Sequence, residues 1–240
     1  MDTRRFYREG IKSENLVFFQ AVVEQTDLYI GAKHHLEREA VQGIAKYREE
    51  LIRYIQKDSR FLHSLIPIKP LKGAPLIVMD MCRASALANV GPMAAVAGAF
   101  SKFVGQELLA FSDEIIVENG GDIFISSLTD RKIGIYAGQS PLSNRLAIKL
   151  PCSMTPCGIC TSSGTVGHSL SFGRADAAVV LNQDASVADA CATALGNRVN
   201  QPEDIKKALE TISLVPGFIG ALVIMGETLG AMGEIELCEH

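Results

Sequence analysis

Asp189 and Thr193 carry side chains suited to holding a metal ion. They stand four residues apart in the run Ala188-Asp189-Ala190-Cys191-Ala192-Thr193-Ala194, which we expect to be helical, so both project from one face of the helix. A carboxylate beside a hydroxyl is suitable oxygen ligation for Mg²⁺, which keeps waters or ligand phosphates at its other positions. The alternative is a helix face turned to solvent. Asp189 and Thr193 are therefore the candidate metal ligands.

The segment Asn119-Gly120-Gly121-Asp122 lies between two runs rich in β-branched residues. Paired glycines allow main-chain N–H groups to approach an anionic or planar ligand, and the aspartate offers an acceptor. The same residues are also good chemistry for a plain hairpin turn. Cofactor binding and simple turn formation both remain open for these four residues.

A third segment, residues 161–169, holds five hydroxyl groups, two glycines and His168. Main-chain amides and hydroxyls in such a loop are able to hold phosphate oxygens, although the segment lacks the Gly-Lys-Ser/Thr of a Walker A loop. A polar surface loop is the alternative. The cofactor-binding candidates here are Thr161, Ser162, Ser163, Gly164 and Thr165. His168 is a candidate catalytic residue or a structural hydrogen-bonding residue.

Cys157 and Cys160 form a Cys-x-x-Cys pair and are the other catalytic candidates. Cys160 precedes the loop of N–H and O–H donors, which we expect to stabilise a thiolate, and we expect Cys157 to be close enough to resolve a persulfide. Structural zinc would need distant ligands such as Cys82 or Cys191. Thiols without a chemical role are the alternative.

The elements that must position these residues follow from the hydrophobic pattern. We expect a hairpin over 16–31 at the edge of a larger sheet, an amphipathic helix over 35–58, and a Pro-rich loop over 66–75. Two packed helices follow over 84–109, with the second entered through Pro92. Further strands are expected over 114–118, 122–125, 132–136, 145–150, 177–181, 218–224 and 234–238, and helices over 186–199 and 203–212.

Strands in clusters with helices between them predict an α+β fold in which mixed or antiparallel sheets pack with helices. The 240 residues suffice for one domain with its own core. We expect a single domain over 1–240, in which the N-terminal hairpin and long helix (about 5–65) are joined by the loop 66–75 to the main part.

Composition limits the partners. Lys and Arg total 23 against 27 Asp and Glu, a net charge of −4, and no basic window suits nucleic acid. The apolar stretches fall short of the ~20 residues of a membrane-spanning helix. The N-terminus shows no signal peptide, so we expect a cytoplasmic protein with no membrane partner.

Taken together, the three segments around Gly121, Ser162 and Asp189 resemble the ApbE flavin transferases, and their order along the chain agrees. In that family a Gly-Gly-Asp turn, a Thr-Ser-Gly segment and an Ala-Asp-Ala-x-x-Thr-Ala-Leu helix surround FAD and Mg²⁺. The resemblance implies an ApbE-like fold. It also implies that Asp189 and Thr193 bind Mg²⁺ with a main-chain carbonyl near residues 95–97, and that Gly120, Gly121 and Asp122 line the nucleotide side.

The chain looks still more like an uncharacterised ApbE-like family of anaerobic archaea and bacteria, a distant relative of the FAD:protein FMN transferase ApbE. The motifs that carry this resemblance lie in residues 90–99, 118–123, 160–172 and 188–197. Two features depart from the ApbE pattern. Val96-Ala97-Gly98 stands where ApbE proteins have Ala-Lys-Gly, and their His-Ile-Ile-Asp-Pro segment is missing.

Three hypotheses for function follow. The first is a pocket that binds a small-molecule or nucleotide ligand, FAD or an adenine nucleotide with Mg²⁺, in a metal-assisted, transferase-like reaction. The second is a flavin-binding module without turnover. The third, implied by the resemblance, is sulfur handling in sulfide assimilation or homocysteine formation, with Cys157 or Cys160 as persulfide carrier and a sulfur-pathway protein as partner. A homo-oligomer stays open.

Overall fold

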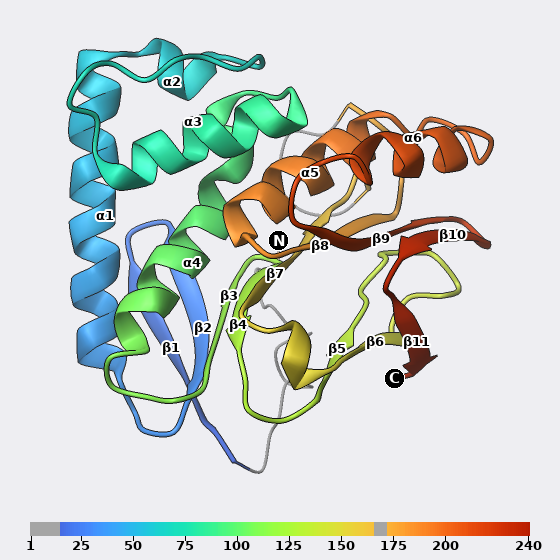
Figure 1. Cartoon of the computed structure of the whole chain (residues 1–240), viewed down its shortest axis with the longest axis horizontal. Coiled ribbons are helices and arrows are strands. Elements are labelled where there is room, and N and C mark those ends of the chain that lie inside the picture. Colours follow the sequence, from blue (N-terminus) through green and yellow to red (C-terminus); the bar gives the residue numbers. More distant parts are fainter. Residues whose placement is uncertain (1–14, 166–171) are drawn as a thin grey trace.

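The computed structural model describes residues 15–165 and 172–240 (Figure 1). Its largest element is an eight-stranded sheet in the order β1-β2-β3-β4-β7-β8-β9-β10, in which every neighbouring pair is antiparallel. The strands are β1 (Val17–Val23), β2 (Thr26–Ala32), β3 (Ile115–Asn119), β4 (Asp122–Ser126), β7 (Cys157–Ser162), β8 (Ala177–Asn182), β9 (Phe218–Met225) and β10 (Thr228–Gly233).

A second, three-stranded sheet has the order β11-β6-β5, again antiparallel. Its strands are β5 (Arg131–Gly134), β6 (Leu146–Leu150) and β11 (Glu236–Glu239). The helices are α1 (Glu37–Lys57), α2 (Arg60–His63), α3 (Leu76–Ala88), the 3₁₀ turn η2 (Pro92–Ala95), α4 (Val96–Leu108), η3 (Cys152–Met154), α5 (Ala185–Asn197) and α6 (Asp204–Ile212).

The large sheet separates two hydrophobic cores. One core joins the sheet to the helices and includes Ile30, Ile44 and Leu195. The other joins the opposite face to the small sheet and includes Ile125, Ile148 and Ile159. In Figure 1 the helices lie above and to the left of the strands of the large sheet, while β5, β6 and β11 lie below β8 and β9. Successive side chains of a strand point to opposite faces of the sheet. Alternate residues therefore enter one core, and the residues between them enter the other.

The helices form where their apolar residues match the surface they cover. On α1, Ala40, Ile44, Tyr47, Leu51 and Tyr54 are buried and recur at steps of three or four residues, so one stripe faces the core. Helix α5 is instead buried almost all round, because it packs between the sheet and helices α3 and α4. Its alanines allow this close packing on several sides.

The α+β class with antiparallel sheets packed against helices is confirmed, as are the edge hairpin and the long helix. The expected elements also differ from the structure in several places, such as the omission of β7 and α2. Helix α3 begins at Leu76, directly after Pro75, rather than near Ala84. Strand β10 was not expected, because Gly230 and Gly233 dilute its β-forming residues.

Within residues 15–165 and 172–240, no single helix has the length and apolar character to cross a membrane. Helix α3 together with η2 and α4 reaches that length and composition as a pair bent by 103°.

Candidate functional site

The turn between β3 and β4 is built by its two glycines. Asn119 pairs with Asp122 across the hairpin, and Gly120 and Gly121 between them have φ of 68° and 107°. Such values favour glycine, which lacks a Cβ. The Gly121 N–H donates to Glu118 Oε1 at 2.8 Å. The segment is therefore a hairpin turn, and its glycines are needed for the backbone conformation.

This turn lies beside the end of β7. Strand β4 pairs with β7, with Ile123 opposite Ile159. A Cβ placed on Gly121 would lie 3.9 Å from the Thr161 carbonyl oxygen. The tertiary structure thus brings the Asn119–Asp122 turn next to the first residue of the predicted hydroxyl-rich segment.

Helix α5 approaches the same place from the helical layer. Its N-cap Asp184 accepts from the N–H groups of Ser186 and Val187. Lys102 of α4 bridges Asp184 and Asp80 of α3, at 2.8 Å to each. These ion pairs are mostly buried and fix the start of α5 against α3 and α4, which sets the position of Asp189 further along.

Asp189 caps the N-terminus of the neighbouring helix. Its Oδ2 accepts from the Gly98 N–H at 2.8 Å, and Gly98 is the third residue of α4. The N-cap of α4, Ala95, supplies no side-chain acceptor of its own. The close approach requires glycine, because a Cβ on Gly98 would lie 2.7 Å from the Asp189 Cβ and 2.3 Å from the Ala185 carbonyl oxygen.

Asp122 and Asp189 form a pair of buried carboxylates, each 8 % exposed. Burial is the main reason that the pKa of Asp122 is raised well above its ordinary value. The charge of Asp189 raises it further, the Cys160 side chain and the Thr161 N–H lower it, and Glu118 adds a small rise. Burial also raises the pKa of Asp189 to about 7, against the opposing effect of the Gly98 and Ala97 N–H groups. The pair therefore disfavours two negative charges unless a cation joins it.

One atom of this pair is left without a partner. The Oδ1 of Asp122 is buried and has no hydrogen-bond partner among the described residues. A buried acceptor left unpaired is unfavourable by about 1–3 kcal/mol. A proton or a cation at this oxygen would remove that penalty.

The donor set suits Mg²⁺ better than a softer metal. Asp122 and Asp189 offer carboxylate oxygens, Thr193 is half-buried one helical turn beyond Asp189, and carbonyls lie at the start of α4. No group of three or more His, Cys, Asp or Glu side chains able to hold a metal occurs among the described residues. Mg²⁺ is commonly held by one or two carboxylates, with waters and phosphates completing its shell. The residues present fit that mode.

Neither acid lines the nearest cavity, of about 260 Å³, but a neighbour of each does: Asn119, opposite Asp122 in the hairpin, and Ala97, which precedes Gly98. Ala97 and Asn119 form part of its wall, and the Asn119 Nδ2 donates to the Ala97 carbonyl oxygen at 3.3 Å. The remaining wall comes from α1, η2, α4 and the β1–β2 turn: Gln25, Thr26, Arg48, Leu51, Ile52, Met93, Val96 and Phe100. The cavity has an apolar lining with a few polar groups, as small-molecule sites do.

The rest of the hydroxyl-rich segment lies at the end of β7 and just beyond it. Ser162 is buried on β7. The Ser163 and Thr165 hydroxyls lie 3.4 Å apart, and the Thr165 hydroxyl bonds to Asp176 Oδ1 at 3.0 Å. The Gly164 N–H donates to the Ala175 carbonyl at 2.9 Å. His168 lies outside the described residues.

The expected thiol pair does not form. Cys157 and Cys160 lie three positions apart on β7, so their side chains point to opposite faces of the sheet, one into each core. Burial raises the pKa of Cys157 to about 12 and that of Cys160 well above its ordinary value. The expectation that loop donors stabilise a Cys160 thiolate is wrong, and so is the expectation that Cys157 can resolve a persulfide formed there.

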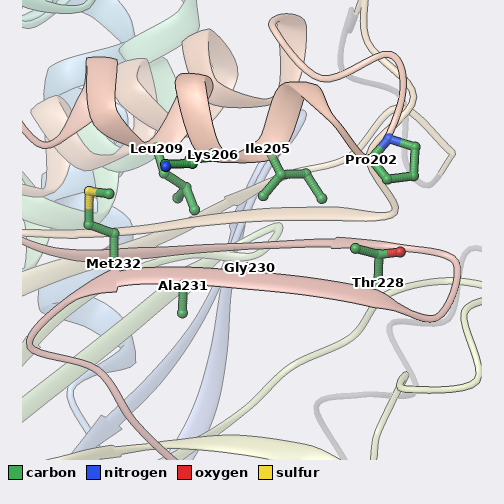
Figure 2. A pocket seen from close by; sticks show the side chains of 8 residues that line it. All are labelled: Pro202, Ile205, Lys206, Leu209, Thr228, Gly230, Ala231 and Met232. Atoms are coloured by element: carbon green, nitrogen blue, oxygen red, sulfur yellow. The ribbon is translucent and has the colours of Figure 1, made fainter.

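A second cavity, of about 270 Å³, lies between α6 and the edge strand β10. Figure 2 shows Ile205 and Leu209 pointing from the helix toward the strand, and Met232 pointing back toward the helix. Lys206 is the charged residue among those that line it. It contains none of the predicted site residues, so the smaller cavity beside Asn119 is the better candidate despite the similar volume.

Sequence reasoning assigned no role of their own to three residues near the site. Glu118 is 2 % exposed, and a carboxylate inside an apolar strand run was a signal that it has a structural or chemical role. The contact of Gly98 with Asp189 gave no local signal, because it spans 91 residues. Arg48 gave none either, since it looks like any charged residue of an amphipathic helix.

Comparisons with known proteins show the family of this chain. A family model described as "AbpE bacteria" matches residues 8–215. The UPF0280 protein of Methanococcus aeolicus is 45% identical over 201 residues, covering 82% of this chain and 81% of the relative. The UPF0280 protein of Methanothrix thermoacetophila is 42% identical over 206 residues, covering 85% and 86%.

Solved structures show the same fold at low identity. The flavin transferase ApbE from Vibrio cholerae superposes with a TM-score of 0.60 at 14% identity, covering 90% of this chain and 96% of that one. The ApbE protein from Thermotoga maritima gives 0.57 at 13% identity, covering 91% and 97%. The architecture described above is thus that of an ApbE-like protein. Within that class, the chain belongs to the UPF0280 family.

Proposed function

We propose that this protein binds FAD or a related adenine nucleotide together with Mg²⁺, in a site between the β3–β4 turn, the end of β7 and helix α5. The observation that carries the proposal is the buried Asp122–Asp189 pair, with one carboxylate oxygen unpartnered. Two acids held out of water close together are suited to a divalent cation that carries a phosphate ligand.

The residues of the chain have distinct roles in this proposal. Asp189 and Thr193, with Asp122 beside them, would hold the metal through oxygen atoms. Gly120, Gly121 and Asn119 would lie against the nucleotide, together with Thr161, Ser162 and Ser163. Gly164 and Thr165 would lie at the edge of the nucleotide site. A bound Mg²⁺ supplies charge neutralisation and Lewis acidity at a phosphoryl oxygen.

The turn and the helix also shape the ligand site without the metal. The Gly120-Gly121 turn keeps side chains away from the end of β7, so that a flat group is able to approach the backbone there. The N-terminus of α4 contributes a positive partial charge near Asp189, which favours phosphate oxygens.

Turnover by a metal-assisted transferase reaction and retention of a flavin without turnover both fit this site. The relatives that share the fold include proteins named flavin transferases. His168, a candidate catalytic residue, lies outside the described residues. The persulfide-carrier alternative loses its support, because both thiols are buried on opposite faces of β7.

Calorimetry with FAD and with AMP tests the proposal, each measured in Mg²⁺ and in EDTA. We expect binding by the native chain to weaken in EDTA, and the Asp122→Asn and Asp189→Asn variants to lose that difference. Asp113→Asn is the matched control, because Asp113 is exposed on the segment before β3. Equal affinity in Mg²⁺ and EDTA for the native chain would contradict the metal-dependent site.

A further inference from the structure

Arg48 is the charged residue among those that line the 260 Å³ cavity, which Ala97 and Asn119 connect to the acid pair. It lies in the middle of α1, half-buried, and lines the 260 Å³ cavity together with Ala97 and Asn119. Its Nη1 donates to Thr26 Oγ1 at 2.8 Å and its Nη2 to Gln25 Oε1 at 2.9 Å. Both acceptors are neutral, so these bonds orient the guanidinium without neutralising it.

No carboxylate lies within 4.0 Å of Arg48 among the described residues, although neighbouring cations on α1 have such partners. Lys46 pairs with Glu107, and Arg53 pairs with Glu49. A guanidinium carries five N–H donors in a fixed fork, and two are in use here. Arg48 therefore keeps its charge and further donors available to a group in the cavity.

The rest of the lining indicates what else the ligand must carry. Met93, Val96 and Phe100 form an apolar wall from η2 and α4. At about 260 Å³ the cavity is below the usual ~300–1,000 Å³ of whole small-molecule sites, so it accommodates one part of a ligand. That part combines an apolar or ring surface with a negatively charged edge.

We propose that Arg48 is a specificity-determining residue that binds an oxyanion, a phosphate or a carboxylate, on the ring-bearing part of the ligand. This inference rests on the proposed function, because it assigns a subsite within the same site. An anion there interacts with Arg48 without breaking an existing ion pair. Charge-assisted hydrogen bonds to an arginine are the stronger kind, and their planar geometry selects oxyanions.

The contribution of Arg48 to anion binding differs from that of the metal site in its dependence on Mg²⁺. The acid pair needs Mg²⁺ to attract an anion, whereas Arg48 is always charged. Preference for an anionic ligand through Arg48 therefore persists in EDTA. This separates the subsite from the metal site in one set of measurements.

The test compares ligand pairs that differ by one anionic group: FMN against riboflavin and AMP against adenosine for phosphate, and nicotinate against nicotinamide for carboxylate. Dissociation constants are measured in EDTA and in Mg²⁺. In EDTA we expect the native chain to prefer the anionic member of at least one pair, and Arg48→Met to reduce that ratio at least about tenfold. Arg48→Lys retains a point charge and restores part of the ratio. The pair that responds identifies phosphate or carboxylate as the group bound.

Arg53→Met is the matched control, because it removes the same charge from the same helix at an exposed position. Thermal unfolding of each variant verifies that it is folded. An anion preference equal in the native chain and Arg48→Met, or equally reduced in Arg53→Met, would overturn the subsite while leaving Mg²⁺ dependence intact. Arg48-dependent preference with no effect of Mg²⁺ would instead contradict the metal site alone. Failure of every probe to bind the native chain would overturn both.

Discussion

The Asp189 carboxylate accepts a hydrogen bond from the Gly98 N–H at 2.8 Å, so the predicted metal ligand is also the N-terminal cap of another helix. One acidic residue thereby links helix stability to the charge of the site. The two roles are separable, because an asparagine retains the acceptor oxygen but lacks the charge.

We expect Asp189→Asn to keep the stability of the native chain within about 0.5 kcal/mol, while Asp189→Ala loses about 1 kcal/mol or more through the missing cap. Both variants should lose Mg²⁺-dependent nucleotide binding. Urea unfolding in EDTA and calorimetry measure the two effects. Equal stability of the asparagine and alanine variants would show that capping by Asp189 is unimportant.

Gly121→Ala should lower stability by about 1–2 kcal/mol, because an L-residue is disfavoured at positive φ. The φ of 107° at Gly121 is the reason, since the space around its Cβ position is open. We also expect weaker nucleotide binding. Gly196→Ala is the control, as its Cβ would meet its nearest neighbour at 3.5 Å and it lies within α5. Native stability of Gly121→Ala would show that the turn tolerates side chains.

Glu114 should give the protein a marked acid sensitivity. It is 1 % exposed, and its Oε2 accepts from Ser127 Oγ and Arg131 Nη2, each at 2.7 Å, while Lys33 lies at Oε1. Burial alone would raise the pKa of Glu114, but hydrogen bonds from Lys33, Ser127, Leu128 and Arg131 outweigh it and lower the pKa to about 2.

A lowered pKa in the folded state means that the stabilisation is complete above the ordinary value near 4.5 and is lost as pH falls toward 2. We expect Glu114→Gln to lose about 3–5 kcal/mol at pH 7, because it removes the buried negative charge that faces Arg131 and the half-buried Lys33. The difference from the native chain should shrink below pH 4. Glu210→Gln, at an exposed position, is the control. A pH-independent difference would contradict the ionic role.

The thiols should react in the order of their exposure. Cys152 and Cys238 are partly exposed, whereas Cys82, Cys157, Cys160 and Cys191 are buried. Because the thiolate is the reactive form, the raised pKa values of Cys157 and Cys160 slow them further. We expect alkylation of the folded chain, mapped by peptide mass spectrometry, to label Cys152 and Cys238 first. Early labelling of Cys160 would revive a chemical role for it.

Flavin transfer to a protein threonine should not occur. Ala97 stands where the resemblance to ApbE proteins calls for lysine, and in this chain that position is part of the cavity wall. Incubation with FAD, Mg²⁺ and a flavin-accepting protein should leave no covalent fluorescence on a denaturing gel. An authentic ApbE enzyme run in parallel is the positive control. A fluorescent acceptor band would show that the chain is a transferase.

Local sequence determined the features that depend on neighbouring residues alone. The stripe of Ile44, Leu51 and Tyr54 required an amphipathic α1, and Gly120-Gly121 between two β-rich runs required a tight hairpin turn. Asp189 and Thr193 were recognisable as one helix face, because helical spacing is a local property. The motifs also sufficed to indicate an ApbE-like fold.

Tertiary structure alone decided which of these features meet. The contact between Asp189 and Gly98 spans 91 residues and depends on a glycine that allows two helices to touch. Placement of Arg48 at the same cavity depends on how α1 packs against the β1–β2 turn and α4. Cys157 and Cys160 are near in sequence but separated by the sheet, since β7 is buried on both faces. Strand register and close packing depend on contacts between residues far apart in the sequence. They decide which charged groups lie together and which residues line the cavity.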